Sequence, residues 1–492
     1  MVGKNGVFLR LTCLLFSVGL ILSKGYAQTS EPAGIDFQQG LHRLDSIDHL
    51  SPAPFLSASF HRGRRQALRM LMPKHSVAVF FTSPERERTG DFNFTYAPDP
   101  NYYYLSGSIE PHGVLFVYSD SVVIDGIKTN ELLVVQDKDP KSELWNGKKM
   151  GVDVAKSQLG FALVVSISRF LTFNLSDLFF RDLNNLYVQF PRDFDADSPD
   201  VDRGDNKLLG QLVEQFNKIV SKQSRLVTES PRFYVNQLRA IKTPEEIALM
   251  KYCIGISALG HLNVFKNIHS GQFEYQAQAL MEYQFKNHGA EYVAYASICG
   301  SGENSCTLHY DKNDRKMSEG DLLLMDCGAE YHGYCSDITR TIPVNGHFSK
   351  EQLLIYNLVL AAQDAGIAVC HPGGAFDDTR FATQRVIAKG LVELGIIQQE
   401  SEFSRYFMHG TSHFMGLEVH DVGQDLSSKL VAGHVLTVEP GIYIPAGSPC
   451  DPKWWNIGIR IEDDILITET GHINLSGDLP RKPQEIELLM KR

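Results

Sequence analysis

The stretch MDCGAEYHGYCSDITRT, residues 325–341, decides how the rest of the chain is interpreted. Asp326 ends the apolar run Leu322–Met325, and Asp337 follows after two glycines. An acid at the end of a buried strand is costly unless it is paired or bound to a metal. A strand, a turn and a returning strand would bring both carboxylates together. The alternative is a surface hairpin with two exposed acids, which the apolar flank disfavours.

The pattern around Asp326 occurs a second time. Glu439 follows the apolar run Val435–Val438, and a glycine precedes and another follows each of the two acids at matching distances. Thr243 and Ser349 each begin a capping-box pattern, after which two helices are predicted. These helices extend to about Asn287 in the first case and Leu394 in the second. We therefore expect two related halves with a site at their junction.

Histidines are concentrated between these strands. His409, His413 and His420 lie among glycines, without the glutamate of a helical zinc motif. A single histidine would usually be an ordinary core or surface residue, but three so close together favour a site.

The segment Ile457–Asp464 alternates in character. Its isoleucines share one face of a predicted strand, and Arg460 and Glu462 share the other. Taken alone, this segment fits a solvated strand face with a salt bridge. Asp463 breaks the alternation without an evident reason.

Two aspartates, two glutamates and one or more histidines suit manganese, cobalt or zinc. Four carboxylates would be excessive charge for one ion, whereas two divalent ions, roughly 3.5–4 Å apart in such sites, would balance it. Such ions activate water and polarise a carbonyl, which is the chemistry of amide or ester hydrolysis.

Five segments together resemble the pita-bread-fold metallopeptidases, and within them aminopeptidase P. They are TLHY (307–310), the opening stretch, MHGTSHFMGLEVHDVG (408–423), TVEPGIYI (437–444) and GIRIEDDILIT (458–468). YYYLSG (102–107) and ELWNGKKMG (143–151) resemble the N-terminal domain of that family.

The resemblance implies release of the N-terminal residue from peptides whose second residue is proline. It implies two divalent ions, manganese first and cobalt or zinc as alternatives, held by Asp326, Asp337, His413, Glu439 and Glu462. His420 would stabilise the tetrahedral intermediate or move a proton, and Glu439 would help to activate the water. The implied substrate-binding residues are His309, His409, Arg460 and, reaching a neighbouring subunit's site, Trp145.

Other functions fit the same segments less well. A prolidase-type dipeptidase would share the metals, but the stretch Gln424–Ala432 is short and has no arginine. A methionine aminopeptidase would not need the large N-terminal region. A non-catalytic peptide-binding module would not need five intact ligands.

The expected fold class is α+β, with a mixed α/β N-terminal domain at 56–225 and a pita-bread catalytic domain at 226–492. In the first domain, the sequence predicts a helix at His61–Met72. Strands are predicted at Ser76–Thr82, Tyr102–Leu105, Gly113–Tyr118, Glu131–Gln136 and Asn185–Phe190. Residues 28–55 are expected to be an extended lead-in. Asp193–Asp205 is expected to be a surface loop, because it lacks the spacing of a calcium loop.

Residues 1–27 have the features of a signal peptide: a basic start, the apolar run Leu11–Leu22 and a small-residue cleavage site ending at Ala27. An uncleaved anchor is the alternative. We therefore expect export to the periplasm or the outside, with no stable membrane anchor after processing. The formal net charge of −11 disfavours nucleic acid as a partner. The expected partners are peptides and further copies of the chain, as a dimer or tetramer.

Overall fold

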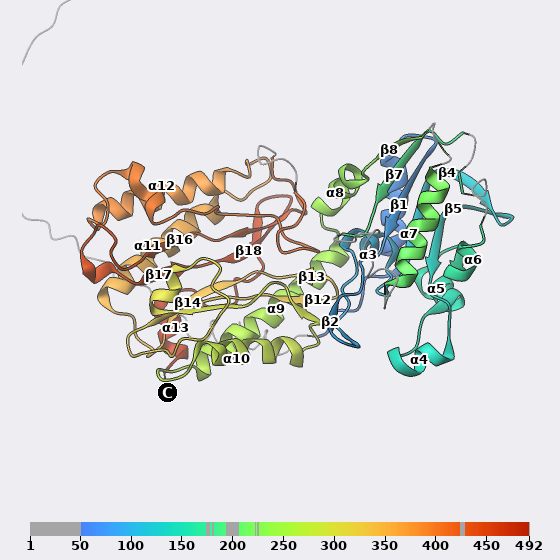
Figure 1. Ribbon diagram of the computed structural model, residues 1–492. Coiled ribbons are helices and arrows are strands. Elements are labelled where there is room, and N and C mark those ends of the chain that lie inside the picture. The colour runs from blue at the N-terminus through green and yellow to red at the C-terminus, as the bar shows by residue number, and fades with distance from the viewer. Residues whose placement is uncertain are drawn as a thin grey trace, which may run out of the picture. The chain divides into compact units, whose positions relative to one another are not determined.

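The computed structural model describes residues 51–173, 178–179, 182–192, 206–221, 223, 226–423 and 429–491. The predicted signal peptide, most of the lead-in and the Asp193–Asp205 loop lie outside these ranges. The described residues belong to one compact unit that begins at Leu44. Figure 1 shows their helices and strands.

The N-terminal domain is built on a six-stranded sheet with the order β6-β5-β4-β1-β7-β8. Its strands are β1 (Ser76–Phe81), β4 (Val114–Ile124), β5 (Ile127–Val135), β6 (Val164–Ser166), β7 (Asn185–Gln189) and β8 (Val227–Glu229). Helices accompany it at α2 (Ala58–Leu71), α3 (Pro100–Ser106), α4 (Pro140–Asn146), α5 (Gly151–Leu159), α6 (Ile167–Phe170) and α7 (Lys207–Val220). The short hairpin β2 (Glu87–Thr89) and β3 (Phe92–Asn93) stands apart from this sheet.

The strand predicted at Tyr102–Leu105 is wrong, because these residues belong to helix α3. The Asp99 side chain accepts hydrogen bonds from the first backbone N–H groups of the helix, and Pro100 occupies its first turn. Gly107 ends it with a φ of 75°, a left-handed conformation that suits glycine. Cap and stop signals therefore outweigh the aromatic, strand-like composition.

The N-terminal sheet also extends beyond the boundary predicted at 225. Strand β8 pairs in parallel with β7, so this sheet ends at Glu229. Helix α8 (Arg232–Ala240) then leads into the catalytic domain.

The catalytic domain consists of two halves of similar construction. The first contains α9 (Pro244–Asn267), α10 (Glu274–Asn287) and a sheet of β10 (Ile298–Ser301), β11 (Leu322–Asp326) and β14 (Thr339–Pro343). The second contains α11 (Lys350–Ala368), α12 (Asp378–Glu393) and a sheet of β15 (Val435–Val438), β18 (Asp463–Ile467) and β19 (His472–Asn474).

Smaller elements complete this domain. A second sheet in the first half joins β9 (Tyr292–Val293), β12 (Ala329–Tyr331) and β13 (Tyr334–Cys335), and β16 (Gly441–Ile444) pairs with β17 (Ile457–Arg460). The remaining elements are η2 (Gly302–Cys306), η3 (Glu400–Arg405), η4 (Pro452–Trp454) and α13 (Pro483–Leu489).

The two halves also have individual hydrogen bonds at equivalent positions. Both predicted capping boxes are present, at the starts of α9 and α11. After α9 the N–H of Gly271 donates to Met317 O, and after α11 that of Gly373 donates to Leu430 O, both at 2.8 Å. Among the described residues, only α9 is long and apolar enough to cross a membrane, but 72% of its apolar window is buried. It is the central core helix of the first half.

Candidate metal centre and active site

Strand pairing in the first half brings Asp326 and Asp337 together. Asp326 is the last residue of β11 and pairs with Thr339, two residues after Asp337. The Tyr295 hydroxyl oxygen lies 2.6 Å from Asp326 Oδ1 and 2.5 Å from Asp337 Oδ1, so it can donate its proton to either carboxylate. The returning-strand prediction is therefore confirmed, and the surface-hairpin alternative is wrong. Sequence analysis missed Tyr295, which lies outside the matched segments.

His413 and Glu439 enter from the second half. The segment that carries His413 lies against β15. The backbone N–H of Thr437 donates to His413 O at 2.9 Å, and the Thr437 hydroxyl accepts from the His413 N–H at 3.1 Å. This fixes the ring with Nε2 3.3 Å from Asp337 Oδ2 and 3.7 Å from Glu439 Oε1.

Glu462 lies between β17 and β18, and only 1% of it is exposed. The Thr339 hydroxyl donates to its Oε2 at 2.7 Å. Ligand atoms of Asp337, His413 and Glu462 all lie within 4.8 Å of one another. The solvated strand face considered for Arg460 and Glu462 is wrong, because both side chains are buried.

Asp463, which the alternation left unexplained, points into the protein on β18. Its Oδ1 accepts from Arg340 Nη2 at 2.7 Å and from the Ser476 hydroxyl at 2.7 Å. Arg340 Nη1 also donates to the Glu462 carbonyl at 2.6 Å. Asp463 therefore anchors the turn that carries Glu462.

Crowded carboxylates dominate the electrostatics of the centre. Burial and the neighbouring acids raise the pKa of Asp337 and of Glu462, and burial raises that of Glu439 to about 8. Burial would lower the pKa of His413, but its contact with Asp337 raises it to about 9. Buried carboxylates at such distances need positive charge between them. Oxygen donors with one imidazole suit a divalent ion such as manganese, cobalt or zinc, so these residues fit such ions.

Asp326 differs from the other acids. Burial would raise its pKa, but the guanidinium of Arg460 holds it below the ordinary value. Arg460 Nη2 donates to Asp326 Oδ2 at 2.6 Å, and its Nη1 donates to the Tyr443 hydroxyl at 2.8 Å. Asp326 is therefore held as an anion that faces the cavity.

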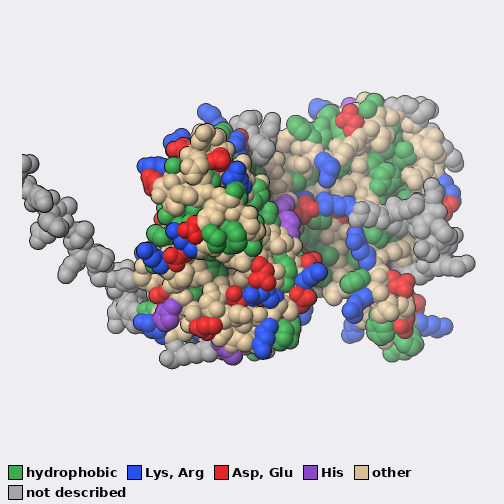
Figure 2. Space-filling view, turned by 60° about the vertical axis from the view of Figure 1, so that its left-hand side comes forward, with side chains coloured by type: hydrophobic (Ala, Val, Ile, Leu, Met, Phe, Trp, Pro, Cys, Tyr) green, Lys and Arg blue, Asp and Glu red, His purple; other side chains and the backbone are tan. Residues whose placement is uncertain are grey.

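The cavity at this centre has a volume of about 520 Å³. It is lined by all five predicted ligands and by His309, His409, His420 and Arg460. His409 Nε2 lies 2.8 Å from the Tyr443 hydroxyl, and burial lowers the pKa of His409 to about 4. The His413 and His420 rings meet edge to face with centroids 4.2 Å apart. Figure 2 shows histidine side chains in a hollow of the surface, beside acidic and basic ones.

Tryptophan predictions have mixed outcomes. Trp145 lies on α4 with 86% of its surface exposed and does not line this cavity, so its role in a neighbouring subunit stays a prediction. For Trp454 and Trp455, the sequence leaves open a place at the substrate entrance or simple surface packing. Trp454 is buried in the core, and Trp455 Nε1 donates to Ser448 O at 3.0 Å. Packing therefore accounts for both residues of this pair.

The chain resembles known proteins over most of its length. Residues 248–469 match the family model of metallopeptidase family M24, and residues 61–182 match that of the aminopeptidase P N-terminal domain. The Xaa-Pro aminopeptidase of Escherichia coli K12 is 37% identical over 87% of this chain and 96% of its own. That of Haemophilus influenzae is 34% identical, with the same coverage of both chains.

Solved structures agree in fold. Aminopeptidase P from E. coli with the inhibitor Pro-Leu matches with a TM-score of 0.79 at 36% identity, over 89% of this chain and 99% of that one. An aminopeptidase from Pseudomonas aeruginosa matches with a TM-score of 0.80 at 33% identity, over 89% and 98%. A further E. coli structure is a zinc-substituted form with product.

Proposed function

Because the chain belongs to the Xaa-Pro aminopeptidases of metallopeptidase family M24, we propose that it hydrolyses the bond between an N-terminal residue and a following proline. The observation that carries this function is the convergence of acids and histidines from both halves on one cavity. The pita-bread catalytic domain and the N-terminal domain agree with the solved aminopeptidase P structures.

The number, identity and ligands of the metal ions go beyond what the family match shows. We propose two divalent ions, manganese under physiological conditions. Asp326, Asp337, His413, Glu439 and Glu462 would hold them. When bound, these ions activate water and polarise the scissile carbonyl. The support is the short spacing of Asp337, His413 and Glu462 and the raised pKa values of the acids.

The remaining side chains position the substrate and move protons. The anionic Asp326 would receive the free amino group, which restricts the reaction to N-termini. His420 has its pKa lowered by burial and by His413, so its ring is neutral at pH 7 and can pass a proton or donate to the developing oxyanion. Glu439 would accept a proton from the attacking water.

The proline ring needs a pocket of the right shape, because proline offers no N–H to bind. His309, His409 and Arg460 line one wall of the cavity. The Tyr443 hydroxyl joins His409 to Arg460, so this wall is held rigid by two hydrogen bonds of 2.8 Å. We assign it to the proline side of the substrate.

Export and assembly are proposals of the same kind. The first 27 residues support cleavage after Ala27 and a periplasmic or secreted enzyme, which N-terminal sequencing of protein from cell fractions would test. The exposed Trp145 supports a homo-oligomer in which it reaches a neighbouring site. Sedimentation of the unmodified protein and of Trp145→Ala would test that assembly.

A matched peptide series tests the function directly. The metal-stripped protein would be given manganese, cobalt or zinc and then Xaa-Pro, Xaa-Pro-Yaa or Xaa-Ala-Yaa. We expect metal-dependent release of Xaa from Xaa-Pro-Yaa. Cleavage of Xaa-Pro alone would make the protein a prolidase, and no cleavage with any metal would favour a binding role.

A further inference from the structure

A second cavity lies beside the catalytic one and has a volume of about 620 Å³. Its walls come from the N-terminal domain, chiefly between Ser83 and Ile109, from the first half of the catalytic domain, and from Leu417, Glu418 and Val419 of the second half. Val419 lines both cavities, and Ala294 lines the second cavity next to Tyr295 and Ala296 of the first. The two cavities are therefore neighbours that share Val419 as a lining residue.

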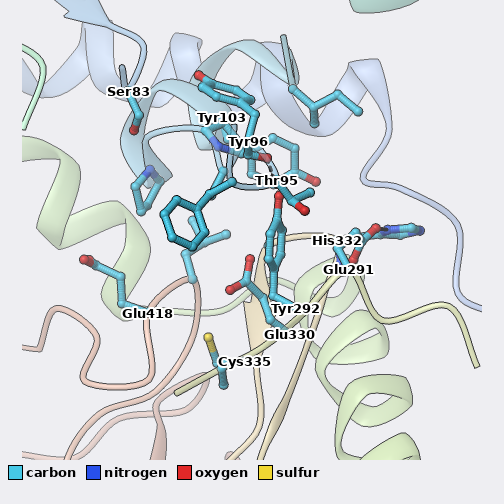
Figure 3. A pocket seen from close by; sticks show the side chains of 18 of the residues that line it. Ser83, Thr95, Tyr96, Tyr103, Glu291, Tyr292, Glu330, His332, Cys335 and Glu418 are labelled. Atoms are coloured by element: carbon cyan, nitrogen blue, oxygen red, sulfur yellow. Dashed lines mark hydrogen bonds and ion pairs between the residues drawn. The ribbon is translucent and has the colours of Figure 1, made fainter. Parts of the chain in front are cut away.

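One small sheet forms a wall of the second cavity. Glu330 on β12 pairs with Tyr292 on β9 and with Cys335 on β13, and all three line the cavity. Directly paired residues lie on the same face of a sheet. Figure 3 shows Glu330 and Tyr292 pointing the same way, toward the segment that carries Thr95 and Tyr96. The Tyr292 hydroxyl donates to the Tyr96 carbonyl, which joins the two walls.

Glu330 is the unusual residue in this wall. The other acids of the cavity have partners: Glu291 accepts from His332, and Glu418 accepts from Arg192 and Arg239. Within the described part of the chain, the Glu330 carboxylate has no hydrogen bond or ion pair. Burial, and then the charge of Glu291, raise its pKa to about 7. An unpaired carboxylate in such a place is costly and would gain much from a cation.

The lining also holds two arginines, Arg86 and Arg192, and Arg192 is paired with Glu418 at 2.7 Å. The aromatic part of the lining suits a cation on a long carbon chain. Aromatic rings of Phe55, Phe94, Tyr96, Tyr103 and Tyr292 surround the space. Aromatic faces attract ammonium and guanidinium groups and also accommodate their methylene stems. An apolar occupant would leave Glu330 unpaired, and an acidic one would add to the repulsion between Glu330 and Glu291.

We propose that this cavity is the subsite for the side chain of a basic N-terminal residue, arginine or lysine, with Glu330 as its charged partner. The proposal rests on the aminopeptidase function, because it places the N-terminal amino group at Asp326. The side chain of that residue then passes Val419 into the second cavity. This subsite favours peptides that begin Arg-Pro or Lys-Pro.

Three peptides test the assignment: Arg-Pro-Ala-Ala, Met-Pro-Ala-Ala and Ala-Pro-Arg-Ala. The readout is the ratio of kcat/KM for the Arg-Pro peptide to that for the Met-Pro peptide, with the metal-loaded enzyme. Glu330→Gln, which keeps the shape and removes the charge, should lower this ratio about tenfold or more. Phe94→Ala, at a half-exposed position of the wall, should lower it about threefold. Glu214→Gln, on the distant α7, should leave it unchanged.

An unchanged ratio in folded Glu330→Gln would overturn the subsite, as would a loss confined to Ala-Pro-Arg-Ala. Thermal unfolding checks that the variant folds; if it does not, an unchanged ratio in Phe94→Ala overturns the proposal instead. Continued cleavage of Met-Pro-Ala-Ala in these cases would leave the aminopeptidase function standing. If the unmodified enzyme cleaved none of the peptides with any metal, both proposals would fall.

Discussion

The two halves of the catalytic domain place an acid at the same point, yet the two acids have opposite electrostatic environments. Asp326, at the end of β11, accepts from Arg460 and Tyr295, and its pKa is held below the ordinary value. Glu439, just after β15, has histidines at 3.6 and 3.7 Å, and burial raises its pKa to about 8. The repeated backbone thus places the two acids at equivalent positions, and their different neighbouring side chains shift their pKa values in opposite directions.

The strongest test of this comparison replaces acids at the point where ligands from the two halves meet. Asp337→Ala or Glu462→Ala should abolish Xaa-Pro hydrolysis and metal binding together, because these side chains lie where ligands from both halves meet. Elemental analysis and peptide assays would measure the two losses. Full activity in either variant would remove the two-ion proposal.

His420→Ala should have the next largest effect. Removing a group that moves a proton or stabilises the oxyanion should lower kcat by roughly 10²–10⁴-fold. Metal content should stay near normal, because we assign no ion to this ring. Loss of metal in this variant would show that His420 belongs with the ligands instead.

Stability measurements on metal-stripped protein compare the two acids directly. Asp326→Ala leaves the buried Arg460 without its carboxylate, so it should lower the free energy of unfolding by about 3 kcal/mol. Glu439→Gln removes an acid whose folded pKa is raised, so it should stabilise the protein. Calorimetry of both variants would show the opposite signs.

The stabilisation by Glu439→Gln should depend on pH. A raised folded pKa means that the native state binds the proton more tightly, so stability is full below the unfolded value of 4.5 and is lost as pH rises toward 8. The gain from the substitution should therefore be larger at pH 8.5 than at pH 5. An equal gain at both values would mean that the folded pKa of Glu439 is not raised above its unfolded value.

The smallest expected difference concerns the helix starts. Glu246 in the α9 capping box is buried and also accepts from the Tyr334 hydroxyl at 2.8 Å, whereas Gln352 in the α11 box lies at the surface. Gln352→Ala should cost about 1 kcal/mol, as for an ordinary cap, and Glu246→Ala more, because it leaves a buried hydroxyl without its acceptor. Thermal unfolding of the two variants would rank them, and equal costs would contradict the distinction.

Sequence patterns predicted the repeat and the convergence of ligands because short segments of the chain carry the signals for both. Capping boxes mark α9 and α11, and apolar runs ending in an acid mark β11 and the end of β15. The helix at Tyr102–Leu105 was missed because three tyrosines resemble a strand when their cap at Asp99 is not weighed.

Other parts of the site depend on contacts between distant segments. Tyr295 touches the two aspartates only because β10 pairs with β11, and Tyr443 joins His409 to Arg460 across two strands. The burial of Arg460 and Glu462 depends on β14 lying alongside them, where Thr341 and Thr339 contact their backbones. A local sequence pattern does not indicate contacts between segments that are distant along the chain.

The order of the five proposed ligands along the chain has a consequence for biosynthesis. Asp326 is made first, and Glu462 is made last. A nascent chain that has reached residue 461 already contains every other ligand, but it lacks an acid that closes the centre. A ribosome that stalls before residue 462, or a protease that removes the segment carrying it, would therefore release a product without hydrolytic activity.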